Sequence, residues 1–362
     1  MHKTALNELH RQYGAKLVDF AGWEMPVMYT SITEEHNWCR QHVAAFDVSH
    51  MGRLRFRGGD AEKFLQRMCT RNLSEMPTGL CRYGHVCRED AGILDDVIVS
   101  KFDDHFGMVC NASNREKLLG WFATHLQGAD VQIEDETFET AMLAVQGPEA
   151  LKLLDAVLPI DLSDLKRYRF KSGDFQGAQF AVYRSGYTGE DGAEVVMPAG
   201  FAAIAAALFM QKSAELGTPV KLAGLGARDS LRLEAGMPLY GHELTEAWDS
   251  LTAGQEWCVD LSKEFIGCSR LREIDNAGPE RSMCGFVLEG RRAARQGAKI
   301  IEDGREVGEI TSGALTPTIG KPIAMGLLDT ALASPGSKVP IDLRGTLVEA
   351  EVVPLPFYKR RG

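Results

Sequence analysis

Two adjacent aspartates, Asp95 and Asp96, open the most apolar part of a segment that otherwise has the pattern of a buried strand. Residues 92–100 read Gly-Ile-Leu-Asp-Asp-Val-Ile-Val-Ser, and the β-branched residues favour an extended backbone. Successive strand residues point to opposite faces, so one carboxylate should face inward if the other faces outward. A carboxylate that faces an apolar interior costs free energy unless a partner group or a ligand there binds it. The segment predicts either a functional acid or a strand end where both aspartates cap a turn.

A second segment, residues 184–194, combines three glycines with the acids Glu190, Asp191 and Glu194. Glycines allow a backbone to approach a ligand closely. A carboxylate that accepts two hydrogen bonds suits a ring with adjacent N–H donors, such as the edge of a pterin. The alternative is a hairpin turn whose acids are solvated.

Two more segments carry arginines. Residues 222–236 are rich in glycine but fit no standard phosphate-loop register, and a helix is expected to begin at Arg228 and Asp229. Arg232 follows Arg228 by four residues, so both should lie on one helical face, either for a ligand or in a structural ion pair. The C-terminal residues 356–361 form a basic tail with an aromatic anchor, a kind of segment that is usually solvated.

Composition narrows the classes of function. The chain has 362 residues, enough for two or three domains, and a formal net charge of −10 that argues against nucleic acid as a partner. No apolar run is long enough to span a bilayer, and the N-terminus shows no signal or transit pattern. The eight cysteines have no metal-binding spacing, and isolated histidines such as His36, His50 and His242 are expected to be structural. We expect a cytoplasmic protein without metal or membrane partner.

The element pattern predicts the fold class. Residues 53–133 show the order β-α-β-β-α-β with one extra strand, and residues 141–222 repeat that architecture. After about residue 279, short β segments are separated by Gly and Pro, with Asp303-Gly304 as a hairpin signal. The sequence predicts an α+β protein: two ferredoxin-like, split β-α-β domains followed by an antiparallel β-barrel or jelly roll.

Seven motifs, taken in order, closely resemble the glycine cleavage system T-protein family, and they lie in residues 18–26, 46–52, 92–96, 145–148, 186–192, 224–236 and 309–313. The most specific are Gly-Ile-Leu-Asp-Asp at 92–96 and Gly-Leu-Gly-Ala-Arg-Asp-Ser-Leu-Arg-Leu-Glu-Ala-Gly at 224–236. The resemblance implies a three-domain cloverleaf around a folate channel. Its domains would be 1–51 with 140–278, then 52–139 carrying the catalytic aspartate, and 279–362 as the barrel.

The resemblance also implies a reaction and its residues. An aminomethyltransferase of this family would take the aminomethyl group from the dihydrolipoyl arm of lipoylated H protein. The one-carbon unit would pass to tetrahydrofolate, giving ammonia and 5,10-methylenetetrahydrofolate. Asp96 matches the catalytic carboxylate, as a general base or as an electrostatic anchor. The residues that match folate-binding positions are Asn111, Glu194, Arg228 and Tyr358, with Met51, Tyr83 and Arg295 as further pocket residues.

Two other functions fit a protein of this fold. One is a folate-dependent demethylase acting on an N-methylglycine or a methylated sulfur compound. The other is a non-catalytic folate-binding protein of iron–sulfur assembly, whose K-G-C-Y-x-G-Q-E signature is replaced here by Met-Pro-Leu-Tyr-Gly-His-Glu at 237–243. Basic residues are candidates for docking an acidic carrier or holding the folate tail, namely Arg291, Arg292, Lys359, Arg360 and Arg361.

Overall fold

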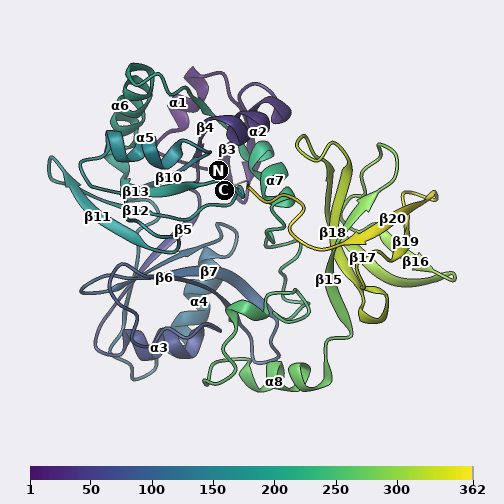
Figure 1. Cartoon of the computed structure of the whole chain (residues 1–362). Helices are drawn as coiled ribbons and strands as arrows, with labels where there is room; N and C mark the ends of the chain where they lie inside the picture. The colour runs from purple at the N-terminus through teal and green to yellow at the C-terminus, as the bar shows by residue number, and fades with distance from the viewer. Residues whose placement is uncertain (361–362) are drawn as a thin grey trace. The chain divides into compact units, whose positions relative to one another are not determined.

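The structure is a computed structural model that describes residues 1–360 (Figure 1). It contains two compact units, each assembled from several stretches of chain. Unit 1 comprises Met1–Glu62, Glu75–Arg82 and Ile98–Asp229, and unit 2 comprises Lys63–Ser74, Tyr83–Val97 and the chain from Ser230 onward. The chain changes unit inside helices α3 (Ala61–Met68) and α7 (Leu225–Glu234) and inside strands β6 (Cys81–Cys87) and β7 (Ile93–Lys101). The three expected domains and their cloverleaf arrangement stay a prediction.

A six-stranded sheet with the order β11-β12-β13-β10-β4-β14 lies at the centre of unit 1. All its pairs are antiparallel except β4 with β14. Its strands are β4 (Val43–Asp47), β10 (Thr140–Gln146), β11 (Phe170–Phe175), β12 (Ala178–Tyr183), β13 (Gly192–Pro198) and β14 (Val220–Leu222). Strand β4 is buried along its whole length because strands flank it on both sides.

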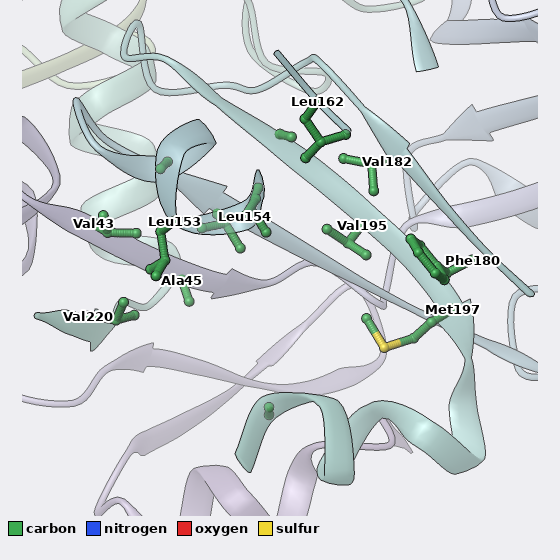
Figure 2. Packing of buried hydrophobic residues seen from close by; sticks show 14 of the residues in the cluster. Val43, Ala45, Leu153, Leu154, Leu162, Phe180, Val182, Val195, Met197 and Val220 are labelled. Atoms are coloured by element: carbon green, nitrogen blue, oxygen red, sulfur yellow. The ribbon is translucent and has the colours of Figure 1, made fainter. Parts of the chain in front are cut away.

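Helices α5 (Ala150–Val157) and α6 (Ala202–Glu215) belong to the same core. Leu153 and Leu154 of α5 belong to one buried cluster with the strand residues Val182 and Val195 (Figure 2). Burying one such side chain contributes on the order of 1.5–3 kcal/mol. This cluster therefore supplies much of the stability of unit 1. A short 3₁₀ helix, η1 (Ala199–Phe201), precedes α6.

The N-terminal part of the chain, up to Gln41, forms a small sheet and two helices. Strands β2 (Lys16–Phe20) and β3 (Trp23–Met28) make a hairpin, with β1 (His2–Lys3) parallel to β3. The turn residues Ala21 and Gly22 both have positive φ, 51° and 81°, the geometry that a two-residue hairpin turn needs. Helix α1 (Asn7–Gln12) precedes the hairpin and helix α2 (Ile32–Gln41) follows it. The Ser31 side chain caps α2 by accepting from the Glu34 backbone.

The second sheet has the order β6-β7-β8-β5-β9. Its other strands are β5 (Gly52–Arg57), β8 (Phe106–Cys110) and β9 (Gln132–Asp135), and helix α4 (Arg115–His125) follows β8. Leu54 and Phe56 are buried, as their alternation with arginines predicts. The Phe56 ring lies 5.5 Å from the ring of Phe122 on α4, so this helix covers one face of the sheet.

Unit 2 contains a closed barrel of six antiparallel strands in the order β15-β18-β17-β16-β19-β20. The strands are β15 (Arg281–Leu288), β16 (Lys299–Glu302), β17 (Arg305–Leu315), β18 (Pro322–Asp329), β19 (Lys338–Asp342) and β20 (Leu347–Val353). Asp303 and Gly304 form the expected hairpin, with φ of 50° and 75°. Helix α8 (Cys268–Ala277) and the short helices η2 (Glu256–Cys258) and η3 (Thr330–Leu332) complete the unit. The predicted α+β class with a C-terminal antiparallel barrel is confirmed.

Candidate active site

The two aspartates of β7 differ in exposure, as strand alternation predicts. Asp95 is fully buried and Asp96 is half-buried. Tyr83 on the neighbouring strand β6 donates a hydrogen bond from its hydroxyl to Oδ2 of Asp96 over 3.1 Å. The pair is therefore not a simple strand-end cap: Asp96 is an accessible carboxylate whose orientation a neighbouring tyrosine fixes.

Two ring side chains contact Tyr83 and hold it in place. The rings of Tyr83 and Trp257 stack with centroids 5.2 Å apart, and the Arg71 guanidinium donates to the backbone carbonyl of Trp257. Nε2 of His85 lies 3.4 Å from the Tyr83 hydroxyl, and its Nδ1 lies 2.8 Å from Oγ of Ser250. Burial lowers the pKa of His85 to about 3, so the imidazole is neutral near pH 7. We name Tyr83, His85, Asp96 and Trp257 the Asp96 cluster.

Unit 1 brings together two more predicted residues, Glu194 and Arg228. Glu194 lies on β13, is buried, and accepts a hydrogen bond from the Ser185 hydroxyl. The Arg228 guanidinium lies 4.7 Å from the centre of the Tyr187 ring. Burial lowers the pKa of Arg228, while the nearby Glu194 carboxylate opposes that shift, so the guanidinium stays charged. We name these two residues the Glu194–Arg228 pair.

One guanidinium nitrogen of Arg228 has no protein acceptor. Its Nη1 atom is buried and forms no hydrogen bond to any residue in the described range 1–360. Buried donors nearly always have a partner, and an orphan donor in a native protein calls for an explanation. A ligand that presents an acceptor atom would supply the missing bond. This observation makes the Glu194–Arg228 pair a candidate binding site.

The neighbouring acids of this segment have structural roles. Arg40 binds Glu190 over 2.9 Å, and Arg184 binds Asp191 over 3.0 Å. Of the three acids that the sequence offered, Glu194 is therefore the one that lies beside the unsatisfied arginine. Arg232 is likewise structural, because it forms a buried ion pair of 2.8 Å with Glu243 and donates to Ser312 over 2.7 Å.

The glycines of these segments serve internal packing. A Cβ atom at Gly186 would lie 2.0 Å from Oε1 of Gln146, whose side chain also bonds Thr188 over 3.0 Å. A Cβ atom at Gly224 would lie 2.4 Å from the backbone of Val27. The expected close approach is therefore made by the protein's own groups, which hold the turn that carries Ser185 and Tyr187.

His50 and Met51 follow β4 in unit 1. Burial lowers the pKa of His50 to about 3, and the Arg228 and Arg53 charges add to this effect against the attraction of Asp47. Nδ1 of His50 also has no hydrogen-bond partner within the described residues. Met51 is half-buried, and its carbonyl accepts from Arg53 over 2.6 Å. The neutral His50 therefore belongs to the electrostatic surroundings of Arg228.

The other predicted residues make local contacts. Asn111 follows β8, and its carbonyl accepts from the Asn114 backbone over 3.0 Å. The Tyr358 backbone donates to the Glu234 carbonyl over 2.8 Å, and the exposed Arg295 donates to the Gly313 carbonyl over 3.2 Å. The basic candidates Arg291, Arg292, Lys359 and Arg360 are exposed, and Arg361 lies outside the described residues. These contacts leave their ligand-binding roles as predictions.

Residues 1–360 include no group of three or more His, Cys, Asp or Glu side chains that could hold a metal ion. Within the same range, no helix has both the length and the apolar composition required to cross a membrane. All eight cysteines are free and buried.

Sequence reasoning missed three residues of the site, namely His85, Tyr187 and Trp257. Tyr187 lies inside the glycine-rich segment 184–194, so its position in a motif was a usable signal. Trp257 lies in η2, far along the chain from Tyr83, and only tertiary packing brings the two rings together. His85 stands two residues after Tyr83, where strand alternation alone assigns it no role.

Comparisons with known proteins agree along the whole chain. The family model of the GCVT N-terminal domain matches residues 6–263, and that of the glycine cleavage T-protein C-terminal barrel domain matches residues 281–359. An aminomethyltransferase of Rubrobacter xylanophilus is 46% identical and covers 100% of this chain and 95% of its own. One from Geobacillus thermodenitrificans is 40% identical and covers 99% of both chains. The crystal structure of glycine cleavage system aminomethyltransferase T from Bartonella henselae matches with a TM-score of 0.92, at 33% identity over 99% of both chains.

Fold and comparisons together define a folate-dependent aminomethyltransferase, built from an α+β body and a C-terminal barrel. The chain belongs to the glycine cleavage system T-protein family. The resemblance that the motifs indicated is thereby confirmed, and the demethylase and iron–sulfur alternatives are not favoured.

Proposed function

We propose that the chain transfers the one-carbon unit of an aminomethyl group, carried on the dihydrolipoyl arm of lipoylated H protein, to tetrahydrofolate. Ammonia and 5,10-methylenetetrahydrofolate are the products. The single observation that carries this proposal is the Asp96 carboxylate, half-buried and oriented by Tyr83 within a chain of the T-protein family. A fixed acceptor of this kind can serve a nitrogen that gains positive charge as it attacks carbon.

Asp96 is the proposed catalytic residue. Its carboxylate would orient the attacking pterin nitrogen and stabilise the charge that develops there, acting as base or as anchor. Tyr83 donates a hydrogen bond to Oδ2 of Asp96 and so fixes the orientation of the carboxylate. The stacked Trp257 ring limits the motion of Tyr83 and so limits the motion of the carboxylate.

The Glu194–Arg228 pair fits one end of a reduced pterin. The Glu194 carboxylate suits adjacent N–H donors, and the orphan Nη1 of Arg228 suits a ring or tail oxygen. Met51, Asn111, Tyr358 and Arg295 are proposed as further folate-binding residues. Tetrahydrofolate is a substrate in this proposal, and no metal is assigned.

Lipoylated H protein is the proposed partner. The exposed arginines and lysine Arg291, Arg292, Lys359 and Arg360 support electrostatic docking of an acidic carrier or binding of the folate glutamate tail. We also infer a cytoplasmic location, since eight free, buried cysteines are typical of a reducing compartment.

The decisive assay combines the purified chain, H protein loaded with the aminomethyl group, and tetrahydrofolate. Release of ammonia with formation of 5,10-methylenetetrahydrofolate is expected. A parallel reaction offers N-methylglycine in place of loaded H protein. Turnover of N-methylglycine, with no ammonia from H protein, would instead support the demethylase function.

A further inference from the structure

A cavity of about 260 Å³ lies in unit 1, and its lining includes neither Glu194 nor Arg228 nor any residue of the Asp96 cluster. Its walls include one side chain from each strand of the six-stranded sheet, namely Phe175, Phe180, Val195, Val145, Ala45 and Leu222. Adjacent strands are about 4.8 Å apart, so this lining crosses the sheet from one edge to the other. The cavity is therefore elongated and suits a linear molecule better than a compact ring. Figure 2 shows Phe180, Val195 and Met197 of this wall.

Small side chains on α6 explain why the space is open. The residues that this helix buries are Ala202, Ala206 and Ser213, and Ala205 and Ala206 line the cavity. Helix α5, in the same core, buries Leu153 and Leu154. Protein interiors are normally packed with few voids larger than a water molecule. An apolar cavity of this size therefore has the properties of a binding site.

The rim of the cavity is apolar and exposed. Ile204 and Leu208, four residues apart on α6, form one stripe, and the Ile204 side chain is 57% exposed. Phe175 and Phe201 are also exposed and belong to the lining. Exposed apolar residues that continue into an apolar cavity mark an entrance for an apolar molecule.

Near β4, the cavity is lined by polar side chains that are hydrogen-bonded to one another. Oδ2 of Asp47 accepts from the Thr4 hydroxyl over 2.6 Å and from Nε2 of His10 over 2.8 Å. Burial by itself would raise the pKa of Asp47, yet these bonds and that from Ser49 lower it, so the carboxylate is ionised. Nδ1 of His10 lies 2.8 Å from the Tyr29 hydroxyl.

The polar groups beside the cavity favour a hydroxyl head group. Tyr29 lines the cavity, and its hydroxyl shares one hydrogen bond with Nδ1 of His10. The phenolic group keeps one further hydrogen-bonding capacity, as donor or as acceptor according to the direction of that bond. A ligand hydroxyl can both donate and accept, so it can pair with Tyr29 in either case. A carboxylate ligand would instead meet the buried charge of Asp47.

We propose that this cavity binds a linear aliphatic molecule with a neutral hydroxyl head group, its hydroxyl placed at Tyr29 and its chain beneath α6. A cavity of roughly 150 Å³ accommodates benzene. By that measure the present cavity holds roughly ten non-hydrogen atoms. Medium-chain primary alcohols have this size and chemistry, and this site is independent of one-carbon transfer.

Calorimetric titration of the full chain with 1-octanol tests the proposal. Saturable binding of one molecule is expected. Ala206→Phe fills the cavity and should weaken binding at least tenfold. Ala207→Phe, the matched control on the same helix, places its ring at an exposed position outside the lining and should leave affinity within twofold. Tyr29→Phe should weaken 1-octanol binding about fivefold by removing one hydrogen-bond partner.

Octanoate should bind the unaltered chain at least tenfold more weakly than 1-octanol. Circular dichroism will show whether Ala206→Phe folds. If it does not, the affinity of octanoate relative to 1-octanol and the effect of Tyr29→Phe still test the proposal. The proposal is overturned if 1-octanol does not bind up to its solubility limit. Equal affinity for octanoate, or unchanged affinity in a folded Ala206→Phe variant, also overturns it.

Discussion

The phenolic hydroxyl of Tyr83 donates a hydrogen bond of 3.1 Å to Oδ2 of Asp96, between adjacent strands β6 and β7. This bond gives the acid a defined orientation, and strand alternation gives it exposure that the neighbouring Asp95 lacks. We expect Asp96→Asn to lower the turnover of one-carbon transfer by a factor of about 10² to 10⁴. Folate affinity should change by less than about threefold, because the amide preserves the shape of the side chain. Kinetics and calorimetry on one preparation measure both.

Asp95→Asn is the matched control, since it makes the same chemical change one residue earlier. Asp95 is fully buried, so its loss should reduce the free energy of unfolding by about 1–3 kcal/mol. Turnover per folded molecule should be retained. Equal losses of turnover in the two variants would remove Asp96 from its catalytic role.

Tyr83→Phe should lower turnover by about three- to tenfold, because it removes one neutral donor from the Asp96 carboxylate and leaves the ring stacked on Trp257. Tyr240→Phe is a suitable control, since the Tyr240 hydroxyl donates to the Ile93 carbonyl over 3.2 Å at the start of β7. That change should affect stability and leave turnover within twofold. Unchanged turnover in Tyr83→Phe would show that orientation by Tyr83 is not needed.

Glu194→Gln should weaken tetrahydrofolate binding by about 10- to 100-fold, because hydrogen bonds to a charged acceptor contribute about 1.5–3 kcal/mol. Titration calorimetry with tetrahydrofolate measures the change. Asp191→Asn, in the same segment, alters an acid that pairs with Arg184 and should change affinity less than threefold. The opposite ranking of the two variants would place the pterin elsewhere.

Arg232→Met should destabilise the protein by about 3–5 kcal/mol, because it leaves the buried Glu243 carboxylate without its ion-pair partner. The double variant Arg232→Met, Glu243→Leu should recover at least half of this loss, since it removes both charges. Chemical unfolding followed by fluorescence gives the free energies of unfolding of the unaltered protein, the single variant and the double variant. A double variant no more stable than the single one would contradict the ion-pair explanation.

Stability should fall as the pH is lowered from about 6.5 toward 3. Burial lowers the pKa of His85 to about 3 in the folded chain, whereas the unfolded histidine takes up its proton near pH 6.5. Protons then bind the unfolded state preferentially, at a cost to stability of up to about 1.4 kcal/mol per pH unit.

His85→Gln should flatten this dependence between pH 6 and 4, measured as urea midpoints at each pH. His125→Gln changes a partly exposed histidine of α4 and should leave the slope of urea midpoint against pH unchanged. An unchanged slope in His85→Gln would mean that other groups carry the acid sensitivity.

Much of the fold was predictable because local signals were strong. The alternation at Leu54 and Phe56 and the Asp303-Gly304 turn each specify one structure through the chemistry of a few neighbouring residues. The hairpin at 16–28 is hard to predict because its turn uses Ala21 with positive φ, a conformation in which Gly or Asn is expected.

The site was predictable only in part. Strand alternation predicted that only one of Asp95 and Asp96 is exposed, and the family motifs indicated that it is Asp96. The stacking of Trp257 on Tyr83 and the orphan nitrogen of Arg228 depend on contacts between residues distant in sequence, which no periodicity encodes. The same holds for the cavity beneath α6, since alanines in a helix predict helicity and not the space left against a sheet.

The ion pair of Arg232 and Glu243 also bears on how such a chain can be recombined. Thr311 and Ser312 of barrel strand β17 donate to Glu243 over 2.6 Å and accept from Arg232 over 2.7 Å, respectively. A gene fusion that exchanged the barrel at the gap between residues 263 and 281 would separate these partners. A barrel moved to another protein must therefore be taken together with Arg232 and Glu243, that is, with the chain from Ser230 onward, where unit 2 resumes.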